Sequence, residues 1–448
     1  MVFTRTPVFL EYCKDLLLQK KAFTMIDIKI IRENPDIVEN NLNRRHKPLQ
    51  PLHQLIELDL RRREIIKEVE ELKKERNNIT KNIALLKEQN KPVTSEMQKV
   101  KELPDRIKEL DKELAEKDER CRNLLLVLPN ILQESVHSGK DESENNEIYS
   151  WGEKTKFDFT PKDHQDLGLD LKMLDIERAT KLAGARFYFL KGDLALLEMS
   201  IMRFAADFLM RKKYMLTMPP HMMRKEAYEG VVSLNDFEDV LYKIDNEDLY
   251  MIATSEHPLT AQYMKETLLE EDLPVKLAGF SSCYRKEAGT HGKDTKGIFR
   301  VHQFSKVEQV VLCKPDQSQK LHEEMLENVK EIHKALEIPH RVIVLCSGDT
   351  GTVSSKTYDL EAWMPVQGKY RELASCSNCT DYQSRRLQIK YGQKDQPASG
   401  LVHTLNSTAA VDRALVAIME NFQKEDGSIK IPKALQPYMG KKEITMEK

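Results

Sequence analysis

Long apolar segments are missing from this 448-residue sequence, and none approaches the roughly 18 apolar residues that a membrane-spanning helix needs. Glycine and proline are scarce, at 17 and 18 residues, which excludes collagen-like and low-complexity chains. The seven cysteines are odd in number and mostly scattered, unlike those of a disulfide-rich secreted protein. We therefore expect a soluble protein of a reducing compartment, without a membrane partner, and place it in the cytoplasm.

An excess of either charge is also missing, because 70 Lys and Arg residues face 72 Asp and Glu residues. This balance excludes binding of nucleic acid through bulk positive charge and leaves only local basic patches for that purpose. The chain is 40% hydrophobic and 32% charged, which is typical of a globular protein. Its length exceeds the roughly 100–200 residues of one domain, so we expect two or three domains.

Two glycine-rich phosphate-binding motifs are absent as well. The sequence contains no GxxxxGK followed by Ser or Thr, and no GxGxxG follows a predicted strand. These absences exclude the most common ATP-binding designs. A phosphate-binding site in this chain would have to use arginine and a metal ion instead.

The first 24 residues have no recognisable role. Glu11, Lys14 and Asp15 interrupt their apolar residues, which argues against a secretory signal peptide. The two acids also argue against an organellar transit peptide. A new pattern begins at Met25, so we interpret residues 1–24 as an N-terminal extension or the result of an upstream start.

Residues 52–128 follow a heptad pattern. Apolar side chains recur at steps of three, four or seven in two series, which a polar break at 88–96 separates. The pattern predicts two antiparallel helices of roughly 35 residues each that form a coiled-coil hairpin. Pro104 should kink or restart the second helix. The seam consists of Leu58, Ile65, Val69, Leu72, Ile79, Ile83 and Leu86, with Arg62 and Arg76 at two positions, and of Val100, Leu103, Ile107, Leu110, Leu114, Cys121, Leu125 and Leu128.

The predicted hairpin is the basic part of the chain, since the segment from Arg44 to Arg122 has 21 Lys and Arg against 17 Asp and Glu. Mixed charge on a solvated coiled-coil face explains this composition, and composition alone favours that explanation. A lever that binds a phosphate backbone is the alternative.

The segment at 137–160 is polar, acidic and aperiodic, so we interpret it as a linker. After Pro161, helical patterns alternate with short strand-like runs such as VKLAGFSSCYR and TYDLEAWMP. They predict an α+β domain on a mostly antiparallel β-sheet. The expected organisation is a helical arm domain at 25–136, the linker, and the sheet domain at 161–448.

The segment from Cys283 to Glu308 contains the most informative set of candidate functional residues. Two strand-like pieces flank a loop rich in Gly, Lys and Thr. Any single Arg and Glu in this segment could form an ordinary exposed ion pair between strands. Such pairs explain less well why several functional residue types share one face of the predicted sheet. If the pieces are antiparallel strands, alternation places Arg285 and Glu287 on one face of the first, and Arg300, His302, Phe304, Lys306 and Glu308 on one face of the second.

The segment YRELASCSNCTDYQSRR offers candidate metal ligands. Glu372 and Ser375 could supply oxygen atoms to a hard cation, which suits Mg²⁺ accompanied by phosphate. Cys376 and Cys379 form a CxxC pair, but no second spaced pair of Cys or His lies nearby. We therefore expect these two cysteines to lie in a packed turn and to bind no zinc.

The segment HTLNSTAAVDRALVAIMENFQ leads from a short polar strand or loop into an amphipathic helix. Asn406, Ser407 and Thr408 are good N-capping residue types, and Arg413 lies near the predicted helix start. The segment is either part of a binding site or a capped core helix with an incidental arginine.

Together these segments resemble the seryl-tRNA synthetase family of class II aminoacyl-tRNA synthetases, from Met25 to the C-terminus. The resemblance implies a class II catalytic domain with an antiparallel sheet, preceded by a tRNA-binding helical arm, in a homodimer. It implies ATP-dependent and Mg²⁺-dependent activation of L-serine to seryl-adenylate, followed by transfer to serine tRNA and, as an open question, to selenocysteine tRNA. The matching segments, in the family's order, are MIDIKIIRENPD, the helical arm, RFYFLKGDLALLE, TSEHPLTA, YRKEAGTHGKDTKGIFRVHQFSKVE, ELASCSNCTDYQSRR and HTLNSTA.

The resemblance also implies roles for individual residues. Arg285 would hold the α-phosphate and the serine carboxylate, Glu287 would meet the adenine amino group, and Phe304 would stack on adenine. Arg300 would meet the distal phosphates and Arg413 the nucleotide, so that Arg285, Arg300 and Arg413 are the candidate catalytic residues. Mg²⁺ would be held by Glu372 and Ser375, and the serine by Thr254, Glu256, Arg285, Glu308, Asn406 and Thr408.

Two departures from the family pattern stand out. The segment Lys213–Pro220 is similar to the dimer-forming motif 1, but Lys213 stands where the family usually has Gly. The interval from Thr408 to Arg413 is one residue shorter than usual, which would rotate Arg413 by about 100° unless the missing residue lies before the helix.

Two other functions are compatible with the sequence. The first is a catalytically inactive synthetase-like binding protein, which the joint presence of Arg285, Glu287, Glu308 and Glu372 disfavours. The second is an amino-acid ligase that loads a carrier protein, which the tRNA-type arm disfavours.

Overall fold

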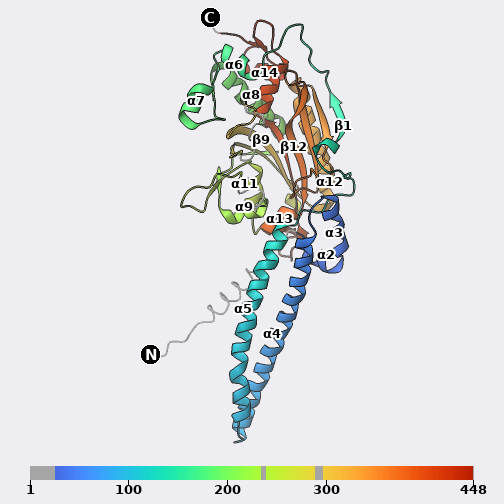
Figure 1. The fold of residues 1–448 in the computed structure, drawn as a ribbon, viewed down its shortest axis with the longest axis vertical. Coiled ribbons are helices and arrows are strands. Elements are labelled where there is room, and N and C mark those ends of the chain that lie inside the picture. Colours follow the sequence, from blue (N-terminus) through green and yellow to red (C-terminus); the bar gives the residue numbers. More distant parts are fainter. Residues whose placement is uncertain (1–25, 234–238, 288–295, 447–448) are drawn as a thin grey trace. The chain divides into compact units, whose positions relative to one another are not determined.

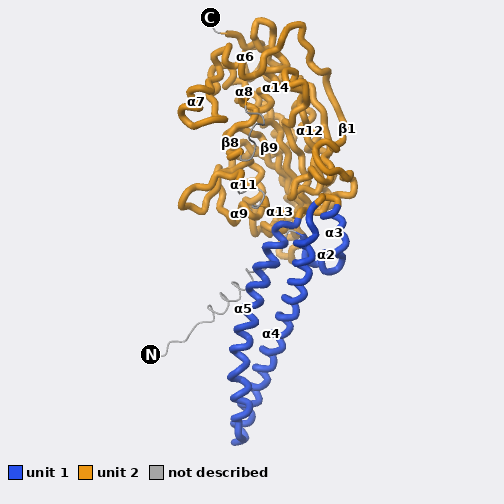
Figure 2. The backbone as a smooth tube through the Cα atoms, in the orientation of Figure 1, with its two compact units in different colours: residues 1–43, 47–128 blue, residues 44–46, 129–448 orange. Residues whose placement is uncertain are grey.

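The computed structural model describes residues 26–233, 239–287 and 296–446 and divides the chain into two compact units (Figure 2). The first unit contains residues 1–43 and 47–128, and the second contains residues 44–46 and 129–448. The extension predicted at 1–24 lies outside the described residues. Within the described ranges, no helix combines the length and apolar character that crossing a bilayer requires.

The first unit is a helical hairpin preceded by two short helices (Figure 1). Its helices are α2 (Ile28–Glu33), α3 (Pro35–Arg44), α4 (Gln50–Glu88) and α5 (Thr94–Val127). The 39 residues of α4 extend about 58 Å at about 1.5 Å per residue. Arg62 pairs with Asp118, and Glu68 pairs with Arg106, so α4 and α5 run antiparallel. The predicted hairpin and its break are therefore confirmed.

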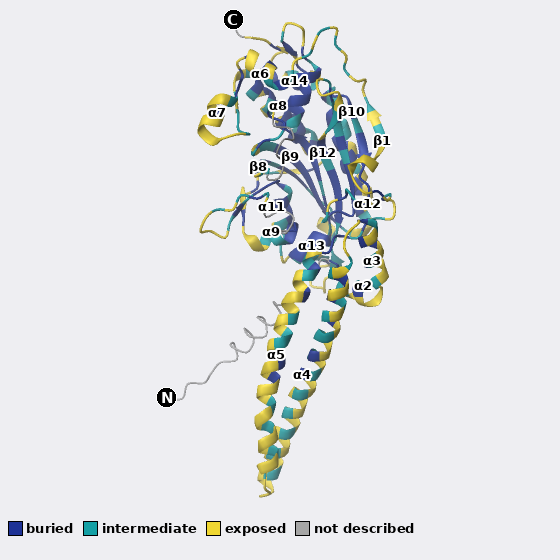
Figure 3. Cartoon of the chain, viewed as in Figure 1, coloured by how far each residue is buried: buried dark blue, intermediate teal, exposed yellow. Residues whose placement is uncertain are grey.

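The heptad seam is buried unevenly. Ile65, Val69, Ile107 and Leu110 form one buried cluster, whereas the seam residues toward the α4–α5 turn are only half-buried (Figure 3). The hydrophobic free energy that holds the two helices together scales with the apolar area removed from water. Most of it should therefore come from the part of the seam that lies away from the turn.

Arg62 and Pro104 differ from the predicted pattern of the hairpin. Arg62 leaves the apolar seam and pairs with Asp118. The helix α5 continues through Pro104, so the predicted restart is wrong. Pro104 is exposed, so water can bind the carbonyl group that its missing N–H leaves unpaired.

The second unit is built on an eight-stranded sheet with the order β1-β10-β11-β12-β15-β9-β8-β4. All neighbouring strands in this sheet are antiparallel except β4 and β8 at one edge. The predicted α+β class with a mostly antiparallel sheet is therefore confirmed. The strands are β1 (Asn146–Trp151), β4 (Met215–Thr217), β8 (Val275–Tyr284), β9 (Gln303–Cys313), β10 (His340–Val344), β11 (Lys356–Met364), β12 (Lys369–Thr380) and β15 (His403–Val411).

Part of the predicted linker belongs to this sheet. Residues Asn146–Trp151 form β1, which pairs with β10, so the linker prediction is wrong for this stretch. Most side chains of this edge strand are exposed, and its polar composition therefore resembled that of a linker. The unit boundary also falls after Leu128, because the Asn130 side chain donates to the carbonyl oxygens of Val353 and Cys379.

Helices and short strands complete the second unit. Helices α8, α12 and α14 contact the central strands and enclose the larger core, which contains Leu197, Val307 and Met325. A smaller core around Tyr228 and Leu387 lies among α9, α11 and α13. The helices are α6 (His164–Asp170), α7 (Ile176–Ala183), α8 (Gly192–Arg211), α9 (Lys225–Val231), α11 (Glu256–Ala261), α12 (Ser318–Ala335), α13 (Tyr382–Leu387), α14 (Arg413–Asn421) and α15 (Gln436–Met439). The short strands are β2 (Leu174–Asp175), β3 (Phe189–Leu190), β5 (Met222–Met223), β6 (Tyr250–Met251), β7 (Thr267–Leu269), β13 (Lys390–Gly392), β14 (Gly400–Leu401), β16 (Ile429–Lys430) and β17 (Glu443–Ile444).

Lys213 lies just beyond the end of α8 in a left-handed backbone conformation, with a φ angle of +66°. Its amide donates to the carbonyl oxygen of Met210. Glycine accommodates this conformation with the least strain. Lys213, where the sequence resemblance leads one to expect glycine, thus occupies a position where the backbone favours glycine.

Candidate active site

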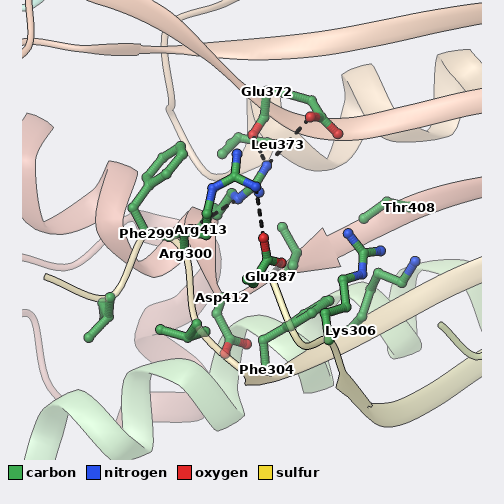
Figure 4. Close-up of a pocket in the computed structure, with 14 residues that line it drawn as sticks. Glu287, Phe299, Arg300, Phe304, Lys306, Glu372, Leu373, Thr408, Asp412 and Arg413 are labelled. Atoms are coloured by element: carbon green, nitrogen blue, oxygen red, sulfur yellow. Dashed lines mark hydrogen bonds and ion pairs between the residues drawn. The ribbon is translucent and has the colours of Figure 1, made fainter. Parts of the chain in front are cut away.

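A polar pocket opens where β9, β12 and β15 meet the start of α14 (Figure 4). Seven of the residues proposed from the sequence line it: Arg285, Glu287, Arg300, Phe304, Glu372, Thr408 and Arg413. The other lining residues are Ile298, Phe299, Val301, Lys306, Leu373, Val411 and Asp412. Residues more than 100 positions apart in the sequence thus converge on one cavity.

The antiparallel pairing behind this pocket was predicted correctly, but the extent of the second strand was not. β8 and β9 pair with Cys283 opposite Phe304. β9 begins at Gln303, so Arg300 and His302 precede the strand instead of sharing its alternation. His302 does not line the pocket, because its Nδ1 lies 3.0 Å from the Tyr242 hydroxyl and 2.9 Å from the Arg285 carbonyl oxygen.

The N-capping interpretation of Asn406, Ser407 and Thr408 is wrong. All three residues lie inside β15, in the middle of the sheet, and the residue preceding α14 is Asp412. Polar residues in a central strand are unusual, and a site on the sheet face explains why this strand contains them. The shorter interval before Arg413 still leaves its side chain in the pocket.

Three arginine side chains line the pocket, Arg285, Arg300 and Arg413. Arg300 donates to the Glu287 carboxylate at 2.8 Å, and Arg413 donates to the Glu372 carbonyl oxygen at 3.0 Å (Figure 4). Burial lowers the pKa of Arg413, an effect that Glu372 opposes. The neighbouring guanidinium groups of Arg285 and Arg300 lower that pKa further. A bound anion would relieve this repulsion, so the arrangement suits a phosphate-bearing ligand.

Aromatic rings lie among these arginines. The Arg285 guanidinium is 5.1 Å from the Phe304 ring centre. Phe299 has Arg413 at 4.9 Å and Arg371 at 4.3 Å from its ring centre. Rings and guanidinium planes so placed can stack on a planar heterocycle or hold one another in position.

Glu287 has a strained backbone, with a φ angle of +49°. A residue with a side chain rarely adopts this left-handed conformation, which tends to occur at functional sites. Its position in the pocket and its pairing with Arg300 are consistent with that tendency.

A second polar cluster surrounds Glu256. Its Oε1 accepts hydrogen bonds from the side-chain amides of Gln383 at 2.8 Å and Asn406 at 3.0 Å. The Thr254 hydroxyl accepts from the Glu256 backbone amide at 3.2 Å. Burial raises the pKa of Glu256 to about 7, and the charge of Glu308 contributes to the shift. The cluster is thus a small acidic subsite with amide groups of fixed orientation.

Glu308 links this subsite to the pocket. Its carboxylate accepts from the Thr408 hydroxyl at 3.3 Å and forms an ion pair with Lys306. Both charged side chains are almost fully buried. Burial of a carboxyl group is costly without such partners, so Lys306 and Thr408 hold the Glu308 carboxyl group in place beside the pocket.

Ser375 does not line the pocket. It faces Asp359 across the β11–β12 pairing, and it opposes the rise in the pKa of Asp359 that burial causes. Asp359 Oδ1 is a buried oxygen without a hydrogen-bond partner, and Glu372 is half-exposed in the pocket. In the described residues, His, Cys, Asp and Glu form no group of three or more that could hold a metal ion. These oxygen donors fit Mg²⁺ only if a ligand's phosphates supply the remaining coordination.

The two cysteines of the CxxC pair lie in β12, so the predicted turn is wrong. The Cys376 thiol faces α12, where it lies 3.8 Å from the His322 carbonyl oxygen. The Cys379 thiol instead accepts from the Asn406 amide at 3.4 Å. Burial raises the pKa of Cys376 to about 12 and that of Cys379 well above its usual value. Zinc binds thiolates, which burial disfavours here.

Replacing Cys376 and Cys379 by serine should therefore change stability by a few kcal/mol at most, because each thiol packs as a small apolar group. The wild-type protein should contain no stoichiometric zinc. Metal analysis of the purified protein and its thermal unfolding measure the two expectations. One tightly bound zinc ion per chain would contradict them.

Sequence reasoning assigned no role to three residues of the site. Lys306 was placed on the correct face, and its pattern of alternation was the signal. Gln383 follows the CxxC pair within a segment already selected, but its contact with Glu256 spans 127 positions and has no local signature. Asp412 precedes Arg413 directly, and a buried acid at the start of a helix resembles an ordinary cap.

The chain is similar to known proteins over most of its length. Residues 25–132 match the family Seryl-tRNA synthetase N-terminal domain, and residues 239–422 match the family tRNA synthetase class II core domain (G, H, P, S and T). The chain is 49% identical over 424 residues to the serine–tRNA ligase of Methanospirillum hungatei, covering 94% of this chain and 100% of that protein. It is 48% identical over 422 residues to the serine–tRNA ligase of Nitrosopumilus maritimus, with the same coverage.

Solved structures of the same family are similar to this chain in fold. The crystal structure of seryl-tRNA synthetase from Pyrococcus horikoshii complexed with ATP superimposes with a TM-score of 0.91 at 44% identity, over 94% of this chain and 100% of that chain. The cytoplasmic serine–tRNA ligase of Naegleria fowleri in complex with AMP gives a TM-score of 0.86 at 34% identity, over 94% and 99% of the two chains. With relatives this similar over nearly their full length, the chain belongs to the seryl-tRNA synthetase family of class II aminoacyl-tRNA synthetases.

Proposed function

We propose that this protein is a serine–tRNA ligase that activates L-serine with ATP and transfers the seryl group to serine tRNA. Family membership supports this function most strongly. The observation on the molecule itself that supports it is the arginine-lined pocket beside the small acidic subsite. The first would receive the nucleotide and the second the amino acid.

The activation step needs positioning and charge neutralisation more than a side-chain nucleophile. The serine carboxylate attacks the α-phosphorus of ATP, the bond to the β-phosphate oxygen breaks, and seryl-adenylate and pyrophosphate form. Arg285 lies between the two subsites, since its Nε donates to the Ala253 carbonyl oxygen and its guanidinium lies beside Phe304. We assign it to the α-phosphate and the serine carboxylate, where its charge would stabilise the transition state.

The other residue roles follow the same division. Phe304 would stack on adenine, Glu287 would meet its amino group, and Arg300 and Arg413 would meet the phosphates. Mg²⁺ would be carried by the phosphates of ATP, with Glu372 as the nearest carboxylate ligand, and would withdraw charge from them. The transfer step then moves the seryl group from the adenylate to a terminal ribose hydroxyl of tRNA and releases AMP.

A homodimer is proposed from the surface formed by α8 and β4, the segment similar to motif 1. Met199, Met215 and Met218 are 68%, 69% and 74% exposed, and α8 contacts β4. Three large apolar side chains exposed on this helix and on the segment that contains β4 indicate a surface that a second copy of the chain covers. Analytical ultracentrifugation tests the stoichiometry, and a monomer at micromolar concentration would contradict it.

Pyrophosphate exchange with a panel of amino acids tests the proposed activity. Serine alone should support exchange, and charging of serine tRNA should follow. Lack of exchange by a folded protein would favour the inactive synthetase-like alternative. Exchange without tRNA charging would favour a ligase that loads a carrier protein.

Glu308→Ala should reduce serine activation by about two orders of magnitude or more. The buried Glu308 and Thr408 would read the serine hydroxyl, and a site built for that hydroxyl rejects alanine because its polar groups would stay unpaired. Pyrophosphate exchange with serine and with alanine measures the effect. If the variant keeps its preference for serine over alanine, Glu308 does not read the hydroxyl.

Serine affinity should depend on pH through Glu256. With its pKa raised to about 7, Glu256 is largely protonated below that pH and ionised above it. The ionised form attracts the serine ammonium group, so KM for serine should fall as pH rises, by up to about tenfold per unit below pH 7. Glu256→Gln should abolish this dependence in exchange assays. Equal pH profiles for the two proteins would exclude Glu256 from the subsite.

The raised pKa of Glu256 also makes the stability of the protein depend on pH. Glu256 binds a proton more tightly in the folded protein than in the unfolded protein, where its pKa is ordinary. Its contribution to the free energy of unfolding is therefore largest below about pH 4.5 and is lost as pH rises toward 7.

A further inference from the structure

Two carboxyl groups lie close together behind the nucleotide pocket, where one serine bridges them. Glu198 belongs to α8, and Asp412, which is 2% exposed, precedes α14 and lines the pocket. Ser305 bridges the two side chains, because its amide donates to Asp412 and its hydroxyl donates to Glu198. The nearest cations in sequence are engaged elsewhere, since Lys306 pairs with Glu308 and Arg413 with Glu372.

Donors from β9 and from the residue before β3 surround this pair. The backbone amide of Ser305 donates to Asp412 Oδ1 at 2.9 Å, and the Ser305 hydroxyl donates to Glu198 Oε1 at 2.8 Å. The Tyr188 hydroxyl donates to Asp412 Oδ2 at 2.8 Å. Both oxygens of Asp412 therefore act as acceptors, which leaves the second oxygen of Glu198 as the place for a proton that bridges the two groups.

The pKa of both carboxyl groups is raised, which favours retention of this proton. Burial raises the pKa of Glu198. Burial and then the charge of Glu198 raise the pKa of Asp412 well above its ordinary value, and Tyr188 and Ser305 oppose that shift. Two carboxylates this close repel each other when both are ionised, so the pair holds one proton to a higher pH than an isolated carboxyl group would.

The network connects directly to the proposed nucleotide contacts. Ser305 follows Phe304, and Asp412 precedes Arg413. Because Ser305 is fixed through both its amide and its hydroxyl, the strand position that carries Phe304 is fixed relative to α8 and α14. Figure 4 shows Asp412, Phe304 and Arg413 around the same pocket.

We propose that Glu198 and Asp412 share one proton and act as a positioning pair that holds Phe304 and Arg413 in place for the nucleotide. The identity of that nucleotide as ATP rests on the proposed function. Loss of the proton places two negative charges in contact, pushes α8 and the start of α14 apart, and loosens the pocket. ATP affinity should therefore fall on the alkaline side, while the serine subsite around Glu256 is unaffected.

Two substitutions of Glu198 distinguish a role in positioning the pocket residues from a role in the stability of the fold alone. In Glu198→Gln, the amide oxygen accepts from Ser305 and the NH₂ group donates to Asp412, so the geometry is kept without a titrating proton. In Glu198→Ala both contacts are lost. The matched control is Asp207→Asn, which alters another α8 carboxylate that accepts from a tyrosine hydroxyl, that of Tyr438 at 2.9 Å.

Calorimetric ATP binding without serine, measured from about pH 6 to about pH 9.5, is the main readout. The wild type and Asp207→Asn should lose about tenfold in ATP affinity on the alkaline side, and Glu198→Gln should bind normally near neutrality without that loss. Glu198→Ala should bind ATP about tenfold more weakly throughout, which corresponds to about 1.4 kcal/mol. Its KM for serine in exchange at neutral pH should stay within about twofold.

The proposal is overturned if Glu198→Gln keeps the wild-type pH profile, or if it is as impaired as Glu198→Ala while thermal unfolding shows both to be folded. Equal losses of ATP and serine affinity in Glu198→Ala would also overturn it, since they indicate general loosening. Absence of serine-dependent exchange in the wild type would reject the proposed function instead, and ATP binding would still test the pair.

Discussion

Arg285→Ala should reduce serine-dependent pyrophosphate exchange by about three orders of magnitude or more while leaving the protein folded. The residue would neutralise charge that develops on the α-phosphate, and removing one such group from a polar pocket typically costs about 10²–10³ in rate. Arg285 would also hold the serine carboxylate, so ground-state positioning is lost as well. Exchange kinetics and thermal unfolding measure the two parts of the expectation.

Arg341→Ala provides a matched control for this substitution. Arg341 is on the same sheet, donates to the Glu361 carboxylate at 2.6 Å and lies 4.7 Å from the Tyr370 ring centre. It does not line the pocket. The control should lose stability of about 1 kcal/mol but keep its exchange rate. Near-normal exchange by a folded Arg285→Ala variant would remove Arg285 from the site.

The arm was predictable because its signal is local and repeated. Heptad positions such as Ile65, Val69, Ile107 and Leu110 recur at helical spacing, and the polar break at 88–96 marks the turn. The strand β1 was not predictable in this way. An edge strand with exposed side chains lacks the alternation that reveals a half-buried strand, and its pairing with β10 spans nearly 200 positions.

The site followed from the sequence where alternation applied. Phe304, Lys306 and Glu308 are spaced by two residues in β9, so their common face could be deduced. Residues brought together by long-range packing could not be deduced, as Gln383 beside Glu256 shows. The residues of β15 were misread as caps, because asparagine, serine and threonine favour helix starts unless a functional site places them in a strand.

Shortening the helical arm should abolish tRNA charging but spare serine-dependent pyrophosphate exchange. We propose replacing Glu71–Pro104 by a flexible linker of about five glycine and serine residues. A deletion of all of 51–128 would also remove the buried Leu52 and Leu55, and Asp59, which accepts from Arg32 at 2.6 Å. The shorter variant keeps these contacts and the buried seam cluster around Ile65, and it removes the half-buried distal seam.

The distal segment is where phosphate contacts would be lost. Residues 71–104 contain eight Lys and Arg against five Glu, so they form a locally basic surface in a balanced chain. Such a surface would bind RNA through phosphate and 2′-hydroxyl contacts to shape, and tRNA affinity of the intact enzyme should fall steeply with added salt. The shortened variant should bind serine tRNA weakly and with a smaller salt dependence.

The two readouts distinguish function from stability. Exchange depends on the sheet unit, which has its own core of Leu197, Val307 and Met325 and does not need the distal hairpin to bury it. A loss of exchange together with charging would mean that the truncation damaged the fold. A well-folded variant that charges serine tRNA as efficiently as the intact enzyme would leave the arm as a solvated coiled coil, whose excess of lysine and arginine serves its own solubility and not the binding of RNA.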